Sequence, residues 1–247
     1  MQIFEPFIWG FDDLEAIFFM TLLLLLYFAD IPYLGNEVPF YLCRMTRKIW
    51  LAGQVVYIVC ATAIYTVAIL LSTILICGQR CYVGNIWSET AVKLAFTSAG
   101  KKLSLAASEK TLELTRPYAC MTTMFFLLFA YALVMVLLIF WIRILWNELA
   151  GMIAGVVFNG ISFIFSPGIL QKLLGISERK SYLANVAAGW ISPLSHATYH
   201  LHNFGYDRLP SLRDSGIYDM VLVIMLILLN LYSIRTYHFV FDGTGER

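Results

Sequence analysis

Long apolar runs limit what this chain can fold into more than any other feature of its sequence. Four of them cover residues 14–34, 50–77, 120–146 and 217–237. Each is long enough to cross about 30 Å of hydrocarbon, which takes a helix of roughly 20 residues. A fifth run, residues 149–165, is shorter and rich in glycine. We therefore expect an all-α membrane protein in which residues 1–247 form one domain with five transmembrane helices.

The overall composition agrees with a membrane protein and excludes several functions. Of the 247 residues, 60% are hydrophobic and 13% are charged, whereas soluble domains carry about 25% charged residues. The net charge is only +1, and Lys and Arg lie mostly between the apolar runs, so no nucleic-acid partner is expected. Five cysteines occur without a CxxC pair, which argues against a zinc ribbon. Cys120 could form a disulfide with Cys77 or Cys81, or all three could be small buried hydrophobes.

The segments between the runs predict the remaining architecture. Residues 78–118 form a long polar loop with one amphipathic helix. In residues 182–204, the break at Ser192 and Pro193 leaves two pieces that are each too short to span, so we expect re-entrant or surface helices there. Gly151 and Gly155 lie one helical turn apart and predict close helix packing in lipid.

The N-terminal residues indicate an orientation. Acidic side chains at Glu5, Asp12, Asp13 and Glu15 replace the basic start of a signal peptide, so we expect this end outside the cell. The positive-inside rule alone is less favourable, because most Lys and Arg then lie in outer segments, although that bias is strongest in short loops.

A basic segment separates the first two runs. Its sequence is GNEVPFYLCRMTRKIWLAGQ, and Pro39 can open a helix over residues 38–48. Arg44, Arg47 and Lys48 would then fall at positions i, i+3 and i+4 on one helix face. Such a face could anchor the chain to lipid headgroups, or it could dock a cytoplasmic partner. Both interpretations stay open on the residues alone.

The pattern PFYLxRxxRKxWxxGQ between two spans resembles the coupling helix of ABC-2 type permeases, the membrane subunits of ATP-binding cassette (ABC) transporters. The long outer loop, the glycine-rich fourth span and the broken segment WISPLSHA are similar as well. That family has six spans, with the coupling helix after the second. The resemblance therefore implies that this chain has five of the six and lacks the first helix of the pattern.

The resemblance also implies partners and a location. Two permeases, identical or different, would pair and each would contact an ABC ATPase subunit, whose closure would rock the halves between inward-open and outward-open states. The chain would be a multi-pass protein of a bacterial plasma membrane with a cytoplasmic C-terminus. The sequence has no GxxxxGK[ST] loop, so ATP and magnesium would bind the partner and this chain would carry no cofactor. The residues expected to contact the ATPase are Pro39, Phe40, Tyr41, Arg44, Arg47 and Lys48.

Three histidines offer a rival chemistry. His196 and His200 have the i, i+4 spacing that brings two imidazoles onto one metal in HExxH proteases, and His202 follows. Ala197 replaces the general-base Glu of that motif, so we expect no catalytic residue. A non-catalytic metal site remains an alternative to plain interfacial histidines.

Few polar groups lie within the apolar runs. They are Asp30 near one end, Asn159 and Asn230. Proton-coupled carriers keep ionisable groups at this depth, so their scarcity favours a hydrophobic or amphipathic cargo such as a peptide, lipid or drug-like molecule, with export the preferred direction. Another multi-span transporter or channel, a membrane scaffold and an intramembrane metal enzyme remain as alternatives.

Overall fold

The computed structural model describes residues 1–32, 44–97, 100 and 108–237. Within these ranges the secondary structure is helical apart from two isolated bridges, which confirms the all-α prediction. The helices up to the middle of the chain are α1 (Glu5–Phe11), α2 (Leu14–Tyr27), α4 (Arg47–Cys77), α5 (Glu89–Phe96), α7 (Glu109–Leu114) and α8 (Pro117–Leu145). They are followed by α9 (Glu148–Ile164), α10 (Pro167–Leu173), α11 (Ser181–Ile191), α12 (Pro193–Ala197), the short 3-10 helix η3 (Tyr199–Leu201) and α13 (Leu212–Ser233).

Three helices of the described chain, α4, α8 and α13, are long and apolar enough to cross a membrane. A fourth span exists if α9 and α10 are counted together, although they meet at an angle of 72°. The fifth expected span is different, because α2 has only 14 residues and rises about 21 Å. Its helix ends at Tyr27, ahead of Pro32, which cannot extend an α-helix.

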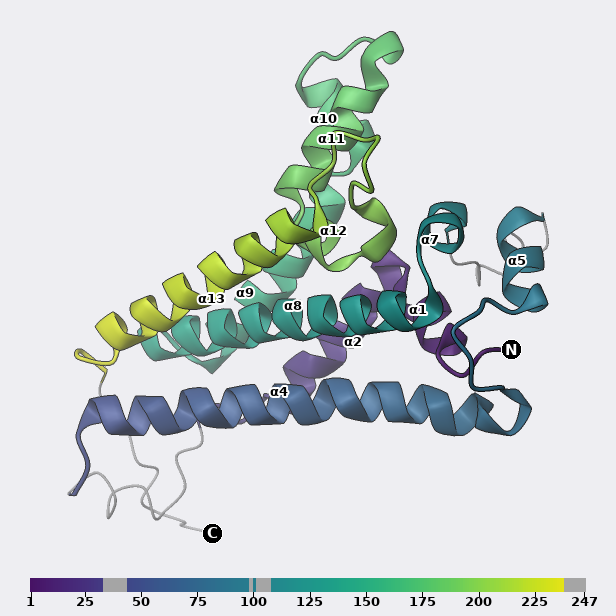
Figure 1. Cartoon of the computed structure of the whole chain (residues 1–247). Helices are drawn as coiled ribbons and strands as arrows, with labels where there is room; N and C mark the ends of the chain where they lie inside the picture. The colour runs from purple at the N-terminus through teal and green to yellow at the C-terminus, as the bar shows by residue number, and fades with distance from the viewer. Residues whose placement is uncertain (33–43, 98–99, 101–107, 238–247) are drawn as a thin grey trace.

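Helix α8 forms the centre of the molecule. In its most apolar window 67% of the residues are buried, against 22% for α4 and for α13. Figure 1 shows α4 and α8 running side by side, with α13 crossing α8 obliquely and α10 and α11 projecting away from them. The exposed apolar faces of α4 and α13 are the surfaces that lipid would cover in a membrane protein.

Glycine lets α9 approach α8 closely. A Cβ atom on Gly151 would lie 2.4 Å from Cγ of Arg143 and 2.9 Å from the carbonyl oxygen of Ile139. One on Gly155 would lie 2.6 Å from Cδ2 of Leu25 on α2. Both positions therefore admit only glycine without movement of their neighbours.

The bundle has two chemically distinct ends. At the end that we call the basic end, α4 begins beside the last turns of α8 and α13. At the opposite end, which we call the pocket end, α2, α8 and α13 begin, and α1, α5 and α7 pack around the N-terminus (Figure 1). Here the acidic N-terminal residues accept internal hydrogen bonds. Glu5 accepts from the backbone and hydroxyl of Ser88, both at 2.7 Å, and Asp12 accepts from the Thr111 hydroxyl at 3.0 Å.

The basic segment differs from the single helix expected over residues 38–48. Thr46 is extended, with φ −79° and ψ 152°, and its side chain accepts the backbone N–H of Ile49. Thr is a favourable N-cap, so a new helix, α4, begins at Arg47. Arg44 lies in the turn before it and does not share a helix face with Arg47 and Lys48. Pro39, Phe40 and Tyr41 lie outside the described residues.

Candidate functional site

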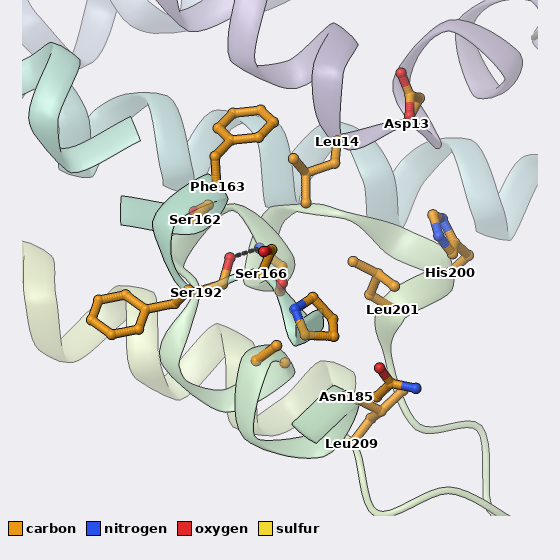
Figure 2. A pocket seen from close by; sticks show the side chains of 15 residues that line it. Asp13, Leu14, Ser162, Phe163, Ser166, Asn185, Ser192, His200, Leu201 and Leu209 are labelled. Carbon is orange, nitrogen blue, oxygen red and sulfur yellow. Dashed lines mark hydrogen bonds between the residues drawn. The ribbon is translucent and has the colours of Figure 1, made fainter. Parts of the chain in front are cut away.

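A cavity of about 500 Å³ lies at the pocket end, where α9, α10, α11, α12 and η3 meet the start of α2 (Figure 2). Its apolar wall consists of Leu14, Phe163, Phe165, Ala188, Leu201 and Leu209. Its polar lining consists of Asp13, Ser162, Ser166, Asn185, Ser192, Ser195 and His200. Figure 2 places Phe163 on one side of the cavity and Asp13, His200 and Asn185 on the other.

Two breaks in the chain create this cavity. Pro167 occupies the first turn of α10, which turns α10 away from α9 by 72°. Pro193 occupies the first turn of α12, and the extended residue Ser192 separates α12 from α11. Serine hydroxyls satisfy the backbone groups freed at the second break: Leu194 N–H donates to Oγ of Ser162 at 3.1 Å, and Ser195 N–H donates to Oγ of Ser192 at 3.3 Å.

Behind the cavity, two histidines meet on one serine, and we call these three residues the Ser215 cluster. Nδ1 of His196 and Nε2 of His202 each lie 2.8 Å from Oγ of Ser215. A hydroxyl donates only one hydrogen bond, so with both rings neutral one ring accepts from Ser215 and the other donates to it. The outer ring nitrogens face the carbonyl oxygens of Trp190 and Tyr199, and only the ring that accepts from Ser215 can also donate to its carbonyl. Because Ser215 belongs to α13 and His196 to α12, the cluster joins these two helices.

Burial sets the charge of the cluster. Ser215 and His202 are fully buried and His196 is 1% exposed. Desolvation lowers the pKa of His202 to about 4 and lowers the pKa of His196. Both rings are therefore neutral near pH 7, and the ring of His196 stacks on Tyr218 with centroids 4.2 Å apart.

His200 points elsewhere. Its backbone N–H and its ring Nδ1 contact Oδ1 of Asp12 at 3.0 and 3.1 Å. The three histidines considered as metal ligands therefore divide between two acceptors instead of converging. Across the described residues, no group of three His, Cys, Asp or Glu side chains is placed to hold a metal ion.

A second polar network crosses the middle of the bundle. The hydroxyl of Tyr131 donates to Oδ1 of Asn159 at 2.6 Å, and Nδ2 of Asn159 donates to the hydroxyl of Thr21 at 2.8 Å. These contacts link α8, α9 and α2. Nδ2 of Asn230 donates to the carbonyl oxygen of Leu226 on its own helix at 2.8 Å and to that of Leu137 on α8 at 3.4 Å.

Two buried charged residues were missed by the sequence analysis. Asp219 is 2% exposed on α13, one turn after Ser215, and its Oδ2 has no hydrogen-bond partner among the described residues. Arg143 is 4% exposed near the end of α8, where its guanidinium donates to backbone carbonyls of Ala29 and Ile31. Asp219 could have been found from its position within the last apolar run.

At the basic end, one arginine ties two helices together. Nη1 of Arg47 donates to the backbone carbonyl of Arg235 just after α13. Trp50 stacks on Tyr237, with ring centroids 6.4 Å apart. Arg44 and Lys48 are exposed. The start of α4 is thus fixed to the end of α13, while two positive charges face outward.

The cysteines make no disulfide in the described part of the chain. Cys60, Cys77, Cys81 and Cys120 are all free, and the thiol of Cys81 contacts the carbonyl oxygen of Cys77 at 3.0 Å. Cys120 is fully buried.

No protein-family model, curated protein or solved structure matches this chain. The function must therefore be argued from the pocket, the Ser215 cluster and the two ends of the bundle.

Proposed function

We propose that this chain is the membrane-spanning permease subunit of an ABC transporter. It pairs with a second permease and with cytoplasmic ATPase subunits, and it exports an amphipathic peptide, lipid or drug-like cargo. The observation that carries the proposal is the contact of Arg47 with the carbonyl of Arg235, which joins the basic end to α13.

Helix α13 provides a mechanical path between the two ends. Its 22 residues rise about 33 Å as one uninterrupted helix. Near the start of α13, Ser215 is hydrogen-bonded to His196 of α12. The residue before His196, Ser195, lines the cavity. A displacement of α4 at Arg47 would therefore be passed along α13 to the wall of the cavity. This is the transmission that an ATP-driven permease requires between its partner and its cargo.

The exposed charges at the basic end supply a surface for the partner. Arg44 and Lys48 carry no ion pair within the described residues. Exposed charges of one sign steer association with a surface of the opposite sign and speed it. An acidic groove on the ATPase subunit would fit them.

A charge-reversal experiment tests this proposal. The tagged chain is purified from native membranes, and the ATPase subunit is expected to copurify with it. The amount of ATPase subunit that copurifies with the double variant Arg44→Glu, Lys48→Glu should be at least tenfold lower. The matched control is Arg179→Glu, Lys180→Glu, which reverses two exposed adjacent charges in the linker between α10 and α11, and it should retain the ATPase. An equal loss in both variants, or a chain that transports without any ATPase, contradicts the proposal.

Asp219 supports a second candidate, a cation-coupled carrier. Buried ionisable residues in membrane helices often mark ion pathways, and Oδ2 of Asp219 has no partner among the described residues. Uptake driven by a proton gradient in vesicles that contain only this chain, and lost in Asp219→Asn, would favour the carrier over the permease.

A further inference from the structure

The cavity has the features of a binding site for an amphiphile. We propose that it binds a molecule with one apolar chain and one ammonium head. As the site that selects cargo, it rests on the proposed permease function, whereas binding itself does not require an ATPase.

The size and wall of the cavity suit an apolar chain. Its volume of about 500 Å³ lies within the 300–1,000 Å³ typical of small-molecule sites. Phe163, Leu14 and Leu201 belong to its apolar lining, and Figure 2 shows Phe163 and Leu14 on the side away from Asn185, with Leu201 between His200 and Asn185. Phe163 is 40% exposed, and its neighbour Ile164 is 57% exposed. A chain can therefore enter from the bilayer beside the end of α9.

The polar side of the cavity selects a positive head. Asp13 carries the one carboxylate of the described lining, and the lining contains neither Lys nor Arg. The Asp13 side chain accepts a single hydrogen bond, from Ala16 N–H at 3.3 Å, so it has capacity for a further donor. A phosphate or sulfate head would face this carboxylate with no cation to offset it.

The neighbouring Asp12 shows why Asp13 is the group that matters. Asp12 is 5% exposed and accepts four hydrogen bonds, from the backbone and ring of His200, from Ser108 N–H and from the Thr111 hydroxyl. Its lone pairs are occupied by the protein. Asn185, which Figure 2 draws beside Leu209 and apart from Asp13, offers a second acceptor within the lining through Oδ1.

The test uses the purified whole chain in a neutral maltoside detergent. The probe is a dodecylammonium that carries a photoreactive diazirine on its chain, and labelled peptides are identified by mass spectrometry. We expect saturable labelling of peptides containing Phe163 or Leu201. Dodecyltrimethylammonium should compete with this labelling, and dodecyl sulfate should not.

Two substitutions make the test specific. Asp13→Asn removes the charge and keeps a good helix N-cap, so it should fold normally and bind the probe about fivefold more weakly. Glu15→Gln removes a neighbouring exposed carboxylate outside the lining and should bind as the unchanged chain does. Ala188→Phe fills the cavity and should abolish labelling.

Equal competition by dodecyl sulfate, unchanged binding in Asp13→Asn, or labelling confined to other helices overturns the site. These results are independent of the ATPase experiment. Copurified ATPase with no labelled pocket would leave the permease proposal standing without this cargo site. A labelled pocket without any ATPase would leave a binding site in a protein of another class.

Discussion

The two ends of the bundle are held together in different ways. At the pocket end, side chains from separate elements bond to one another: Glu5 to Ser88, Asp12 to Thr111, and Ser215 to two histidines. At the basic end, Arg47 and Arg143 instead reach backbone carbonyls at helix ends. The first arrangement fixes the shape of a cavity, because each bond joins two particular side chains. The second leaves side chains such as Lys48 facing outward, available to a partner.

The largest expected effect is at the pocket end, in Ser215→Ala. The change leaves ring nitrogens of His196 and His202 buried without their partner, and each unpaired buried group costs about 1–3 kcal/mol. We expect stability to fall by about 3 kcal/mol, with a drop in melting temperature of about 6–12 °C in detergent. Ser72→Ala is the control, because this exposed hydroxyl contacts only its own helix at Ile69. Equal melting temperatures for the two variants would show that the Ser215 cluster does not hold the pocket end.

At the basic end, the position most sensitive to substitution is Gly151, where α9 packs closely against α8. Gly151→Ala places a methyl group 2.4 Å from Cγ of Arg143, and such overpacking costs typically 1–3 kcal/mol. We expect a loss of about 2 kcal/mol, measured by thermal unfolding. Gly160→Ala on the same helix is the matched control, since its Cβ would meet nothing within 4 Å. If Gly160→Ala loses as much stability as Gly151→Ala, the loss comes from helix propensity or lipid contact. Close packing of α9 against α8 would then not explain it.

Acid should weaken the pocket end selectively. The folded-state pKa of His202 is about 4, below the ordinary value of 6.5, so the unfolded chain binds more protons between these pH values. The contribution of the neutral His202 ring to stability is therefore fully present above pH 6.5. It is lost as the pH drops towards 4, and the free energy of unfolding is lower by about 2 kcal/mol at pH 5. The charged or titratable groups around His202 are His196, which shares Ser215, and Lys110, which donates to its backbone carbonyl at 2.7 Å.

The measurement is the melting temperature at pH 7 and pH 5 for the unchanged chain and for His202→Gln. The variant removes the titrating ring and should flatten this dependence. His200→Gln is the comparison variant, because the ring of His200 is half-buried and contacts Asp12, not Ser215. A pH dependence that persists in His202→Gln would assign it to another group.

The sequence was a good guide to the long helices and a poor one to the polar clusters. Runs of apolar residues determine α4, α8 and α13, because in lipid almost any apolar sequence of sufficient length is helical. The one-turn spacing of Gly151 and Gly155 likewise places both on the face that α9 turns towards α8. The break at Ser192 and Pro193 was predicted, whereas the break at Pro167, which also shapes the cavity, was not.

What the sequence could not provide is pairing across those breaks. His196, His202 and Ser215 lie on separate elements of the chain. Only the fold brings a ring nitrogen of each histidine to 2.8 Å from Oγ of Ser215. The i, i+4 spacing of His196 and His200 suggested a shared target, but α12 ends at Ala197 between them, so the helical spacing does not apply. The role of Arg143 could not be predicted, because its partners are backbone carbonyls, which leave no pattern in side chains.

The smallest expected effect on stability is at the basic end. It gives the clearest test of the difference between the pocket end and the basic end. Arg44→Ala combined with Lys48→Ala removes two exposed charges, and surface substitutions of this kind usually change stability by no more than about 0.5 kcal/mol. We therefore expect an unchanged melting temperature together with weaker recovery of the ATPase subunit. Arg47→Ala should differ, because it also removes the contact with Arg235 and should lower the melting temperature. If the double variant melts lower while it retains its partner, Arg44 and Lys48 serve the fold, and the basic end is a structural anchor instead of a docking surface.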